Sequence, residues 1–164
     1  MSRLTACYAC EQETNFETLP PRELVGVDDA WRVAHAIGTA LPGWLVLLPR
    51  RHIVAIAELT GVEAAGLGVW QVRLSQALHA VTGCAKTYVV AFGEAEGFSH
   101  LHFHVVPRMA EMAEDLRGPG VFGLLGRAAD EQVSAEEMND LAIRLRRHLS
   151  GGSEVPITEA SAAP

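Results

Sequence analysis

The chain has few cysteines and no long hydrophobic run, and each shortage excludes a class of protein. Its 164 residues include 3 cysteines, which cannot all pair within one chain, so we do not expect a disulfide framework. No apolar run approaches the roughly 18 residues of a membrane-spanning helix, and residues 1–5 lack the apolar core of a signal peptide. We therefore expect a cytoplasmic protein that does not enter a membrane.

Positive charge is also scarce, because Lys and Arg number 13 against 20 Asp and Glu, giving a formal net charge of -7. This balance argues against stable binding to nucleic acid, although a nucleotide needs only a local positive potential and backbone N–H groups. The length and a hydrophobic fraction of 49% fit a folded domain with its own core. We expect one domain over residues 1–150 and a flexible tail over residues 151–164.

The hydrophobic pattern alternates between strand and helix periods. Extended segments are expected at residues 23–27, 30–36, 44–48, 86–92 and 100–106. A long helix is expected from Thr60, which with Glu63 forms a capping-box pattern, to about Val81, and a C-terminal helix from Ser134 to about Leu149. The pattern predicts an α+β domain in which an antiparallel sheet of about five strands packs against these two helices.

The segment HLHFHVV, residues 100–106, holds three of the 7 histidines, each separated by one apolar residue. In a strand, His100, His102 and His104 would share one face, with the intervening apolar side chains against a core. One imidazole can add to an activated phosphorus while others bind the phosphate oxygens or protonate the leaving group. Because the outer two would lie about 13 Å apart at ~3.3 Å per residue, we do not expect all three to bind one metal ion.

This segment resembles the signature of the histidine-triad superfamily of nucleotide hydrolases and transferases. In that signature three histidines are separated by single apolar residues and followed by two more apolar residues, and every position matches. The resemblance extends to Pro42-Gly43, to the apolar segment that follows and to the proline-basic-histidine segment ending at His52, and it covers about residues 5–110. It implies an α+β sheet that usually assembles as a homodimer through sheet and helix.

The resemblance also implies the roles of two triad histidines. His102 would attack the α-phosphorus of a nucleoside phosphoanhydride, such as a diadenosine polyphosphate, or of a nucleoside phosphoramidate, and form a nucleotidyl-histidine. His104 would bind the phosphate and assist the leaving group, and water would then release the nucleotide without a metal ion in the chemical step. Two alternatives remain: nucleotidyl transfer or phosphorolysis through the same intermediate, and a nucleotide-binding module without turnover.

A Cys-x-x-Cys pair at Cys7 and Cys10 is by itself compatible with zinc, iron–sulfur or redox roles. Two thiolates and two imidazoles together form a closed tetrahedral zinc site. In many bacterial members of the superfamily such a zinc is held by an N-terminal cysteine pair, the histidine after the proline-basic segment and the first triad histidine. The matching residues here are Cys7, Cys10, His52 and His100. We expect structural zinc and no organic cofactor, with an unmetallated or a redox-active cysteine pair as the alternatives.

The chain departs from the family pattern around the expected nucleotide site. Trp44 follows the glycine where members commonly carry Gly-His, and residues 36–40 contain no Asp or Asn to hold the ribose hydroxyls. Glu94 and Glu96 stand in the loop before the triad, where members often carry Asn and Gly-Gln. Two carboxylates near a phosphate are unexpected, so they would bind a second cation or discriminate against highly charged substrates.

Weaker candidates for substrate binding flank the triad. Ser99 could donate a hydrogen bond to a phosphate oxygen, although a simple strand-entry serine is an equal alternative. Arg108 could neutralise phosphate charge, although an arginine flanking a strand is more often solvated. The remaining tryptophans and histidines are expected to be core, interface or surface residues: Trp31, Trp44, Trp70, His35, His79 and His148.

Overall fold

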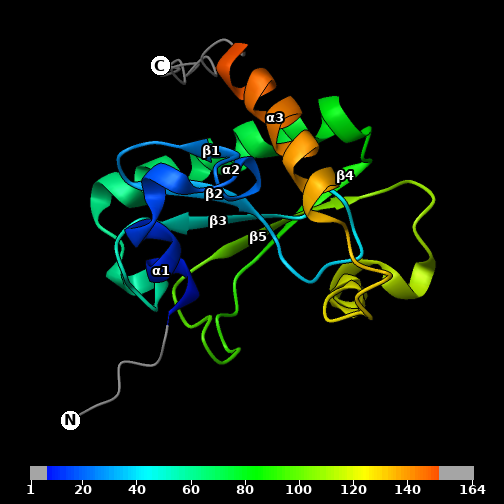
Figure 1. Cartoon of the computed structure of the whole chain (residues 1–164), viewed down its shortest axis with the longest axis horizontal. Coiled ribbons are helices and arrows are strands. Elements are labelled where there is room, and N and C mark those ends of the chain that lie inside the picture. The colour runs from blue at the N-terminus through cyan, green and yellow to red at the C-terminus, as the bar shows by residue number, and fades with distance from the viewer. Residues whose placement is uncertain (1–6, 152–164) are drawn as a thin grey trace, which may run out of the picture.

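The computed structural model describes residues 7–151, and nearly all of the expected tail lies outside them. Five strands form one antiparallel sheet (Figure 1). They are β1 (Gly26–Val27), β2 (Trp31–His35), β3 (Leu45–Pro49), β4 (Lys86–Val90) and β5 (Phe103–Arg108). The expected α+β fold, with a five-stranded sheet, a long helix and a C-terminal helix, is confirmed. A single domain over residues 1–150 stays a prediction.

The strand order is β1-β2-β3-β5-β4, which places the histidine-bearing strand inside the sheet. Strands β1 to β3 follow one another as neighbours, and the long helix α2 (Gly61–Thr82) then carries the chain to the edge strand β4. Strand β5 returns between β4 and β3 and pairs with both. Because both of its edges are hydrogen-bonded, β5 is a rigid support for side chains that must keep a fixed geometry.

Both predicted helices form, and local signals explain where each begins. The Thr60 hydroxyl accepts a hydrogen bond from the Glu63 N–H at 3.2 Å, and the Glu63 carboxylate accepts one from the Thr60 N–H at 2.7 Å, which is the expected capping box. Helix α2 ends at Gly83, whose φ of +71° is favourable for glycine. The C-terminal helix α3 (Ala135–Gly151) follows Ser134, whose hydroxyl accepts from the Glu137 N–H.

Helices α2 and α3 contact each other and cover one face of the sheet (Figure 1). The core lies between these helices and the sheet. Both helices and the sheet contribute fully buried side chains to it, including Trp31, Val33, Leu45, Leu47, Leu74, Val105 and Leu145. Leu101 and Phe103 belong to the same core, as their alternation with the histidines predicted. Within residues 7–151, no helix is long and apolar enough to cross a membrane.

Two local expectations are wrong. The segment expected as a strand over residues 23–27 is a strand only at Gly26–Val27, because residues 21–23 form a 3-10 turn. The three triad histidines do not share one strand face, because β5 begins only at Phe103. The N–H of Leu101 instead donates to the Ile53 carbonyl at 2.7 Å, and His100 lies before the strand with its ring turned to another cluster.

Candidate functional site

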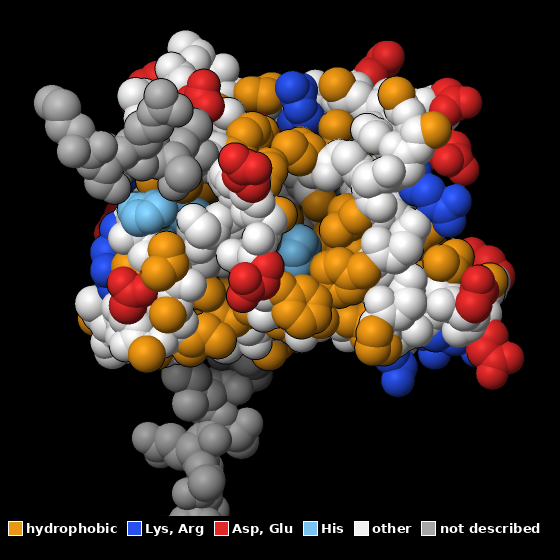
Figure 2. Space-filling model, turned by 90° about the horizontal axis from the view of Figure 1, so that it is seen from below, with side chains coloured by type: hydrophobic (Ala, Val, Ile, Leu, Met, Phe, Trp, Pro, Cys, Tyr) orange, Lys and Arg blue, Asp and Glu red, His pale blue; other side chains and the backbone are white. Residues whose placement is uncertain are grey.

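The face of the sheet opposite α2 and α3 carries a cavity beside the triad. The register aligns Arg32 of β2 with Leu48 of β3, and it aligns Ala34 with Val46 and Val46 with His104 of β5. These side chains therefore share one face. They line a cavity of about 610 Å³, whose further lining includes His102, Phe92, Phe98 and Phe122. Figure 2 shows a histidine on this side of the molecule among hydrophobic side chains, with acidic side chains beside it.

A smaller apolar cluster packs beside the cavity, because its member Ala36 and its neighbours Val46 and Phe122 also line the cavity. It contains Ala36, Leu41, Trp44, Val106, Met112 and Val121. The chain after β5 contributes to it through the 3-10 segment Gly118–Leu124. Since Trp44 is fully buried, it belongs to the core, one of the two positions expected for it, and it does not line the cavity.

The ring of His102 has a defined tautomer. Its Nδ1 lies 2.7 Å from the backbone oxygen of His100, and because a carbonyl oxygen can only accept, Nδ1 carries the proton. The lone pair is then on Nε2, which has no hydrogen-bond partner within residues 7–151, and the His102 side chain lines the cavity. An imidazole in this state is a nucleophile without first losing a proton.

The ring of His104 has the opposite tautomer. The indole Nε1–H of Trp44 donates to Nδ1 of His104 at 3.0 Å, so Nδ1 carries the lone pair and the ring proton is on Nε2. Burial, together with the neighbouring His102, lowers the pKa of His104 to about 4, so the ring is neutral at pH 7. The two histidine rings are 4.9 Å apart between centroids. The lone pair on Nε2 of His102 and the N–H donor on Nε2 of His104 thus belong to neighbouring rings.

His35 fixes the turn that delivers Trp44. Its Nε2 accepts the Gly43 N–H at 3.0 Å, and its Nδ1–H donates to the Ala36 oxygen at 2.8 Å. Gly43 has φ +85°, a conformation that glycine adopts without strain. Burial lowers the pKa of His35, which keeps the ring neutral as both bonds require. The sequence places His35 near a Pro-Gly turn but gives no sign of this hydrogen bond.

The four residues expected to bind zinc form one cluster. Their candidate ligand atoms, in Cys7, Cys10, His52 and His100, all lie within 4.8 Å of one another. Nδ1 of His100 is 3.7 Å from each sulfur, and Nδ1 of His52 is 3.2 Å from the Cys10 sulfur. The Nε2–H of His100 donates to the Pro49 oxygen at 2.8 Å, which leaves Nδ1 unprotonated toward the sulfurs. The donor set, and the hydrogen bond that His100 makes to the Pro49 oxygen, fit a four-coordinate zinc ion.

Ionisation of the Cys10 thiol is unfavourable without a cation. Burial, together with the adjacent Cys7, raises the pKa of Cys10 to about 11 in the absence of metal. A bound divalent cation reverses this preference, because a coordinating thiol is deprotonated outright. The cluster is therefore a site that releases protons as it takes up metal.

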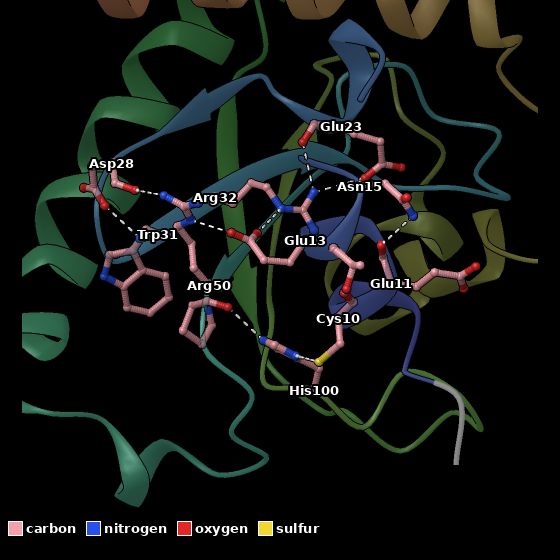
Figure 3. Close-up of polar contacts among 12 residues, drawn as sticks. Cys10, Glu11, Glu13, Asn15, Glu23, Asp28, Trp31, Arg32, Arg50 and His100 are labelled. Carbon is pink, nitrogen blue, oxygen red and sulfur yellow. Dashed lines mark hydrogen bonds and ion pairs between the residues drawn. The ribbon is translucent and has the colours of Figure 1, made fainter. Parts of the chain in front are cut away.

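A buried arginine holds the helix that carries Cys10. Arg32 is 1% exposed and lies between two carboxylates, 3.2 Å from Glu23 and 3.4 Å from Glu13 of α1 (Tyr8–Thr14), as Figure 3 shows. Glu13 also pairs with Arg50 at 2.6 Å, and the Tyr8 hydroxyl donates to Glu23 at 2.7 Å. Arg32, Glu23 and Tyr8 line one end of the cavity. Sequence reasoning missed this network, because its members come from separate segments.

A second ion pair holds the segment that carries His52. The Arg51 Nε donates to Glu63 at 2.6 Å, and Arg51, together with the Thr60 N–H, lowers the pKa of Glu63 to about 2. Glu63 also caps α2, so the segment next to His52 is tied to the first turn of that helix.

The weaker candidates are not brought into the cavity. Ser99 is exposed and precedes His100, and Arg108 lies at the opposite end of β5 from His102; neither lines the cavity. Glu94 lines the cavity, whereas Glu96 is exposed outside it. Substrate contacts by Ser99 and Arg108 stay predictions.

The buried neutral state of His35 makes the fold sensitive to acid. Its pKa is lowered in the folded state, so its contribution is complete above the unfolded value of about 6.5 and is lost as the pH falls toward the folded pKa. The variant His35→Gln can still accept from Gly43 and donate to Ala36 but does not titrate. Urea unfolding between pH 7.5 and 5 should show a shallower loss of stability in this variant than in the wild type. The exposed His148→Gln should follow the wild type, and an equal slope in all three proteins contradicts the role of His35.

No protein-family model and no curated protein matches the chain. Solved structures do match over most of its length. A histidine triad protein from Bradyrhizobium japonicum is 28% identical, with a TM-score of 0.63, and the match covers 83% of this chain and 93% of that one. One from Sinorhizobium meliloti is 27% identical, with a TM-score of 0.63 over 77% of this chain and 90% of that one.

A zinc-bound histidine triad family protein from Mycobacterium smegmatis is 17% identical, with a TM-score of 0.64 over 88% of this chain and 93% of that one. At that identity the likeness concerns the fold. The chain thus has the fold of the histidine-triad proteins and carries their motif at residues 100–106, and its resemblance to that superfamily is confirmed.

Proposed function

We propose that the protein is a nucleotide hydrolase that cleaves at the α-phosphorus of a nucleoside phosphate through a nucleotidyl-His102 intermediate. The observation that carries the proposal is the hydrogen bond from Nδ1 of His102 to the His100 oxygen, which leaves the Nε2 lone pair free at the cavity. The chain's resemblance to the histidine-triad superfamily of nucleotide hydrolases and transferases, carried by its motif at residues 100–106, supports the same reading.

The cavity supports a nucleoside as the bound group. Its volume of about 610 Å³ falls within the ~300–1,000 Å³ typical of small-molecule sites. Its walls are largely apolar, with Ala34, Val46 and Leu48 on the sheet and three phenylalanine rings among the other lining residues. A base and a sugar ring can bury their apolar faces there, while the phosphate lies at the histidines of β5.

In the first step Nε2 of His102 bonds to the α-phosphorus, and the bond from phosphorus to the leaving group breaks. The positive charge on the new imidazolium is stabilised because its Nδ1–H still donates to the His100 oxygen. The Nε2–H of His104 donates to the phosphate or to the departing oxygen. Water then attacks the phosphorus, the P–N bond breaks to return neutral His102, one water proton stays on the product phosphate and the other goes to solvent.

Transfer to inorganic phosphate would use the same intermediate, so product analysis decides between the two reactions. With added phosphate, a hydrolase still yields the nucleoside monophosphate, whereas a phosphorylase yields the nucleoside diphosphate. The absence of stable nucleic-acid binding and a cytoplasmic location remain predictions from composition.

The His102→Ala variant should lose turnover of a diadenosine polyphosphate by at least about 1,000-fold, since it removes the nucleophile itself. Its metal content and thermal unfolding should stay those of the wild type. The wild-type reaction is quenched without acid, and mass spectrometry of its peptides should find one nucleotidyl group on the peptide that contains His102. The variant should carry none. The exposed His148→Ala serves as the control and should keep full activity; near-normal activity in His102→Ala contradicts the mechanism.

We further propose that the cluster of Cys7, Cys10, His52 and His100 holds a structural zinc ion. The zinc-bound relative from Mycobacterium smegmatis shows that this fold accommodates zinc. The ion would fix the ring of His100, whose backbone oxygen in turn orients His102. Its place is structural, because all four positions of a tetrahedron would be filled by protein atoms.

Removing one ligand should remove the metal and weaken the fold. The variant Cys10→Ser should bind less than stoichiometric zinc, and its Tm should fall by roughly 5–10 °C, as expected for a loss of a few kcal/mol. Atomic absorption and thermal unfolding with and without a chelator measure both effects. The buried Cys84, which lies outside the cluster, offers a matched control: Cys84→Ala should keep one zinc per chain. Equal zinc content in the two variants contradicts the assignment.

A homodimer through sheet and helix is the third proposal. Valines are exposed along α2, where Val69 is 52% and Val72 is 45% exposed, and on the adjacent edge strand β4, where Val89 is 41% exposed. The outer edge of β4 pairs with no other described strand. A second copy that covers these valines would remove apolar surface from water, and it could also pair the free strand edge.

Sedimentation velocity tests the dimer. The wild type should sediment as a dimer, and Val69→Asp should shift it toward the monomer, because a carboxylate would be buried in the interface without a partner. Ile56 is similarly exposed, at 56%, but lies in the 3-10 segment Ile56–Glu58 rather than on α2 or β4. The control variant Ile56→Asp should therefore stay dimeric. A wild-type monomer at micromolar concentration contradicts the proposal.

A further inference from the structure

The hydrogen bond from Trp44 to His104 restricts what His104 can do. An indole N–H can donate a proton in a hydrogen bond but cannot accept one. In residues 7–151, Trp44 is the one hydrogen-bond partner of the His104 ring. Trp44 is fully buried, and its ring packs edge-on against both His104 and Phe122, so it cannot turn away without disturbing the smaller apolar cluster.

Protonation of His104 at Nδ1 would place two N–H donors against each other. The surroundings offer no compensation, since the nearest rings are those of Trp44, His102 and Phe122. The charged side chains that line the same cavity are Glu23, Arg32 and Glu94. None of them is hydrogen-bonded to His104, and Glu23 is committed to Arg32 and Tyr8. The low pKa of about 4 agrees with this arrangement.

We propose that Trp44 is a positioning residue that keeps His104 a neutral Nε2–H donor, and that the site therefore favours leaving groups that depart as anions. This inference rests on the proposed function. It goes further, because it assigns a role to a residue that does not touch the substrate and orders two substrate classes that share the same first step.

The two classes differ in the fate of the leaving atom. When a phosphoanhydride P–O bond breaks, the phosphate oxygen leaves with the electron pair as an anion and needs only a hydrogen bond from Nε2–H. When a phosphoramidate P–N bond breaks, the nitrogen leaves as a neutral amine only if it gains a proton. A neutral imidazole N–H is too weak an acid to supply that proton, so the P–N substrate loses the general-acid contribution of about 10²–10⁴-fold.

The test compares two substrates with the same nucleoside, diadenosine triphosphate and adenosine 5′-phosphoramidate. Wild type should show a kcat/KM at least about 100-fold higher for the anhydride. In Trp44→His the new ring can accept a hydrogen bond from a protonated Nδ1 of His104, which permits a charged His104. The ratio of kcat/KM should therefore narrow by at least about tenfold, mainly through kcat on the phosphoramidate. Trp44→Phe keeps an aromatic ring that neither donates nor accepts a hydrogen bond. Its kcat for the anhydride should therefore fall, while the ratio of kcat/KM between the two substrates should not narrow.

Each failure has its own signature. Equal kcat/KM for the two substrates in wild type overturns the inference and leaves the proposed function intact. The same holds if both Trp44 variants slow the two substrates by one common factor, which is what a purely structural role predicts. If Trp44→His does not fold, the wild-type ratio of kcat/KM decides, because Trp44→Phe should leave that ratio unchanged under either role. Cleavage of neither substrate, with no nucleotidyl adduct on His102, contradicts the proposed function itself.

Discussion

The site depends on two hydrogen bonds of opposite sense, each made by an Nδ1 atom of a neighbouring histidine. Nδ1 of His102 donates to a backbone oxygen, and Nδ1 of His104 accepts from the Trp44 indole. The same type of side chain thus presents a lone pair at one position and an N–H at the other. Without these two partners both rings would exchange tautomers freely, and neither role would be fixed.

Much of the surrounding structure keeps these two partners in place. His35 and the positive φ of Gly43 set the turn that delivers Trp44. The Cys/His cluster holds the ring of His100, whose backbone oxygen binds His102. The buried ion pairs around Arg32 fasten the helix that supplies Cys10. Pairing of β5 on both edges then gives the whole arrangement a rigid base.

Features encoded by neighbouring residues could be predicted from the sequence, and features that depend on register could not. The capping box of Thr60 and Glu63, the alternation of apolar residues in the triad and the spacing of the cysteine pair are local patterns, and each predicted its structure. The Trp44–His104 bond joins residues 60 positions apart and exists because β3 and β5 pair in one particular register. The Arg32 network and the start of β5 at Phe103 rather than at His100 likewise depend on how separate segments meet.

The central claim is that His102 and His104 hold opposite tautomers, and nitrogen-15 NMR of histidine-labelled protein tests it directly. Ring nitrogens that carry a proton differ clearly in chemical shift from those that carry a lone pair, and single His→Gln variants assign the signals. The structure predicts a proton on Nδ1 of His102 and on Nε2 of His104 at neutral pH. The same tautomer in both rings, or a doubly protonated His104, would contradict the account.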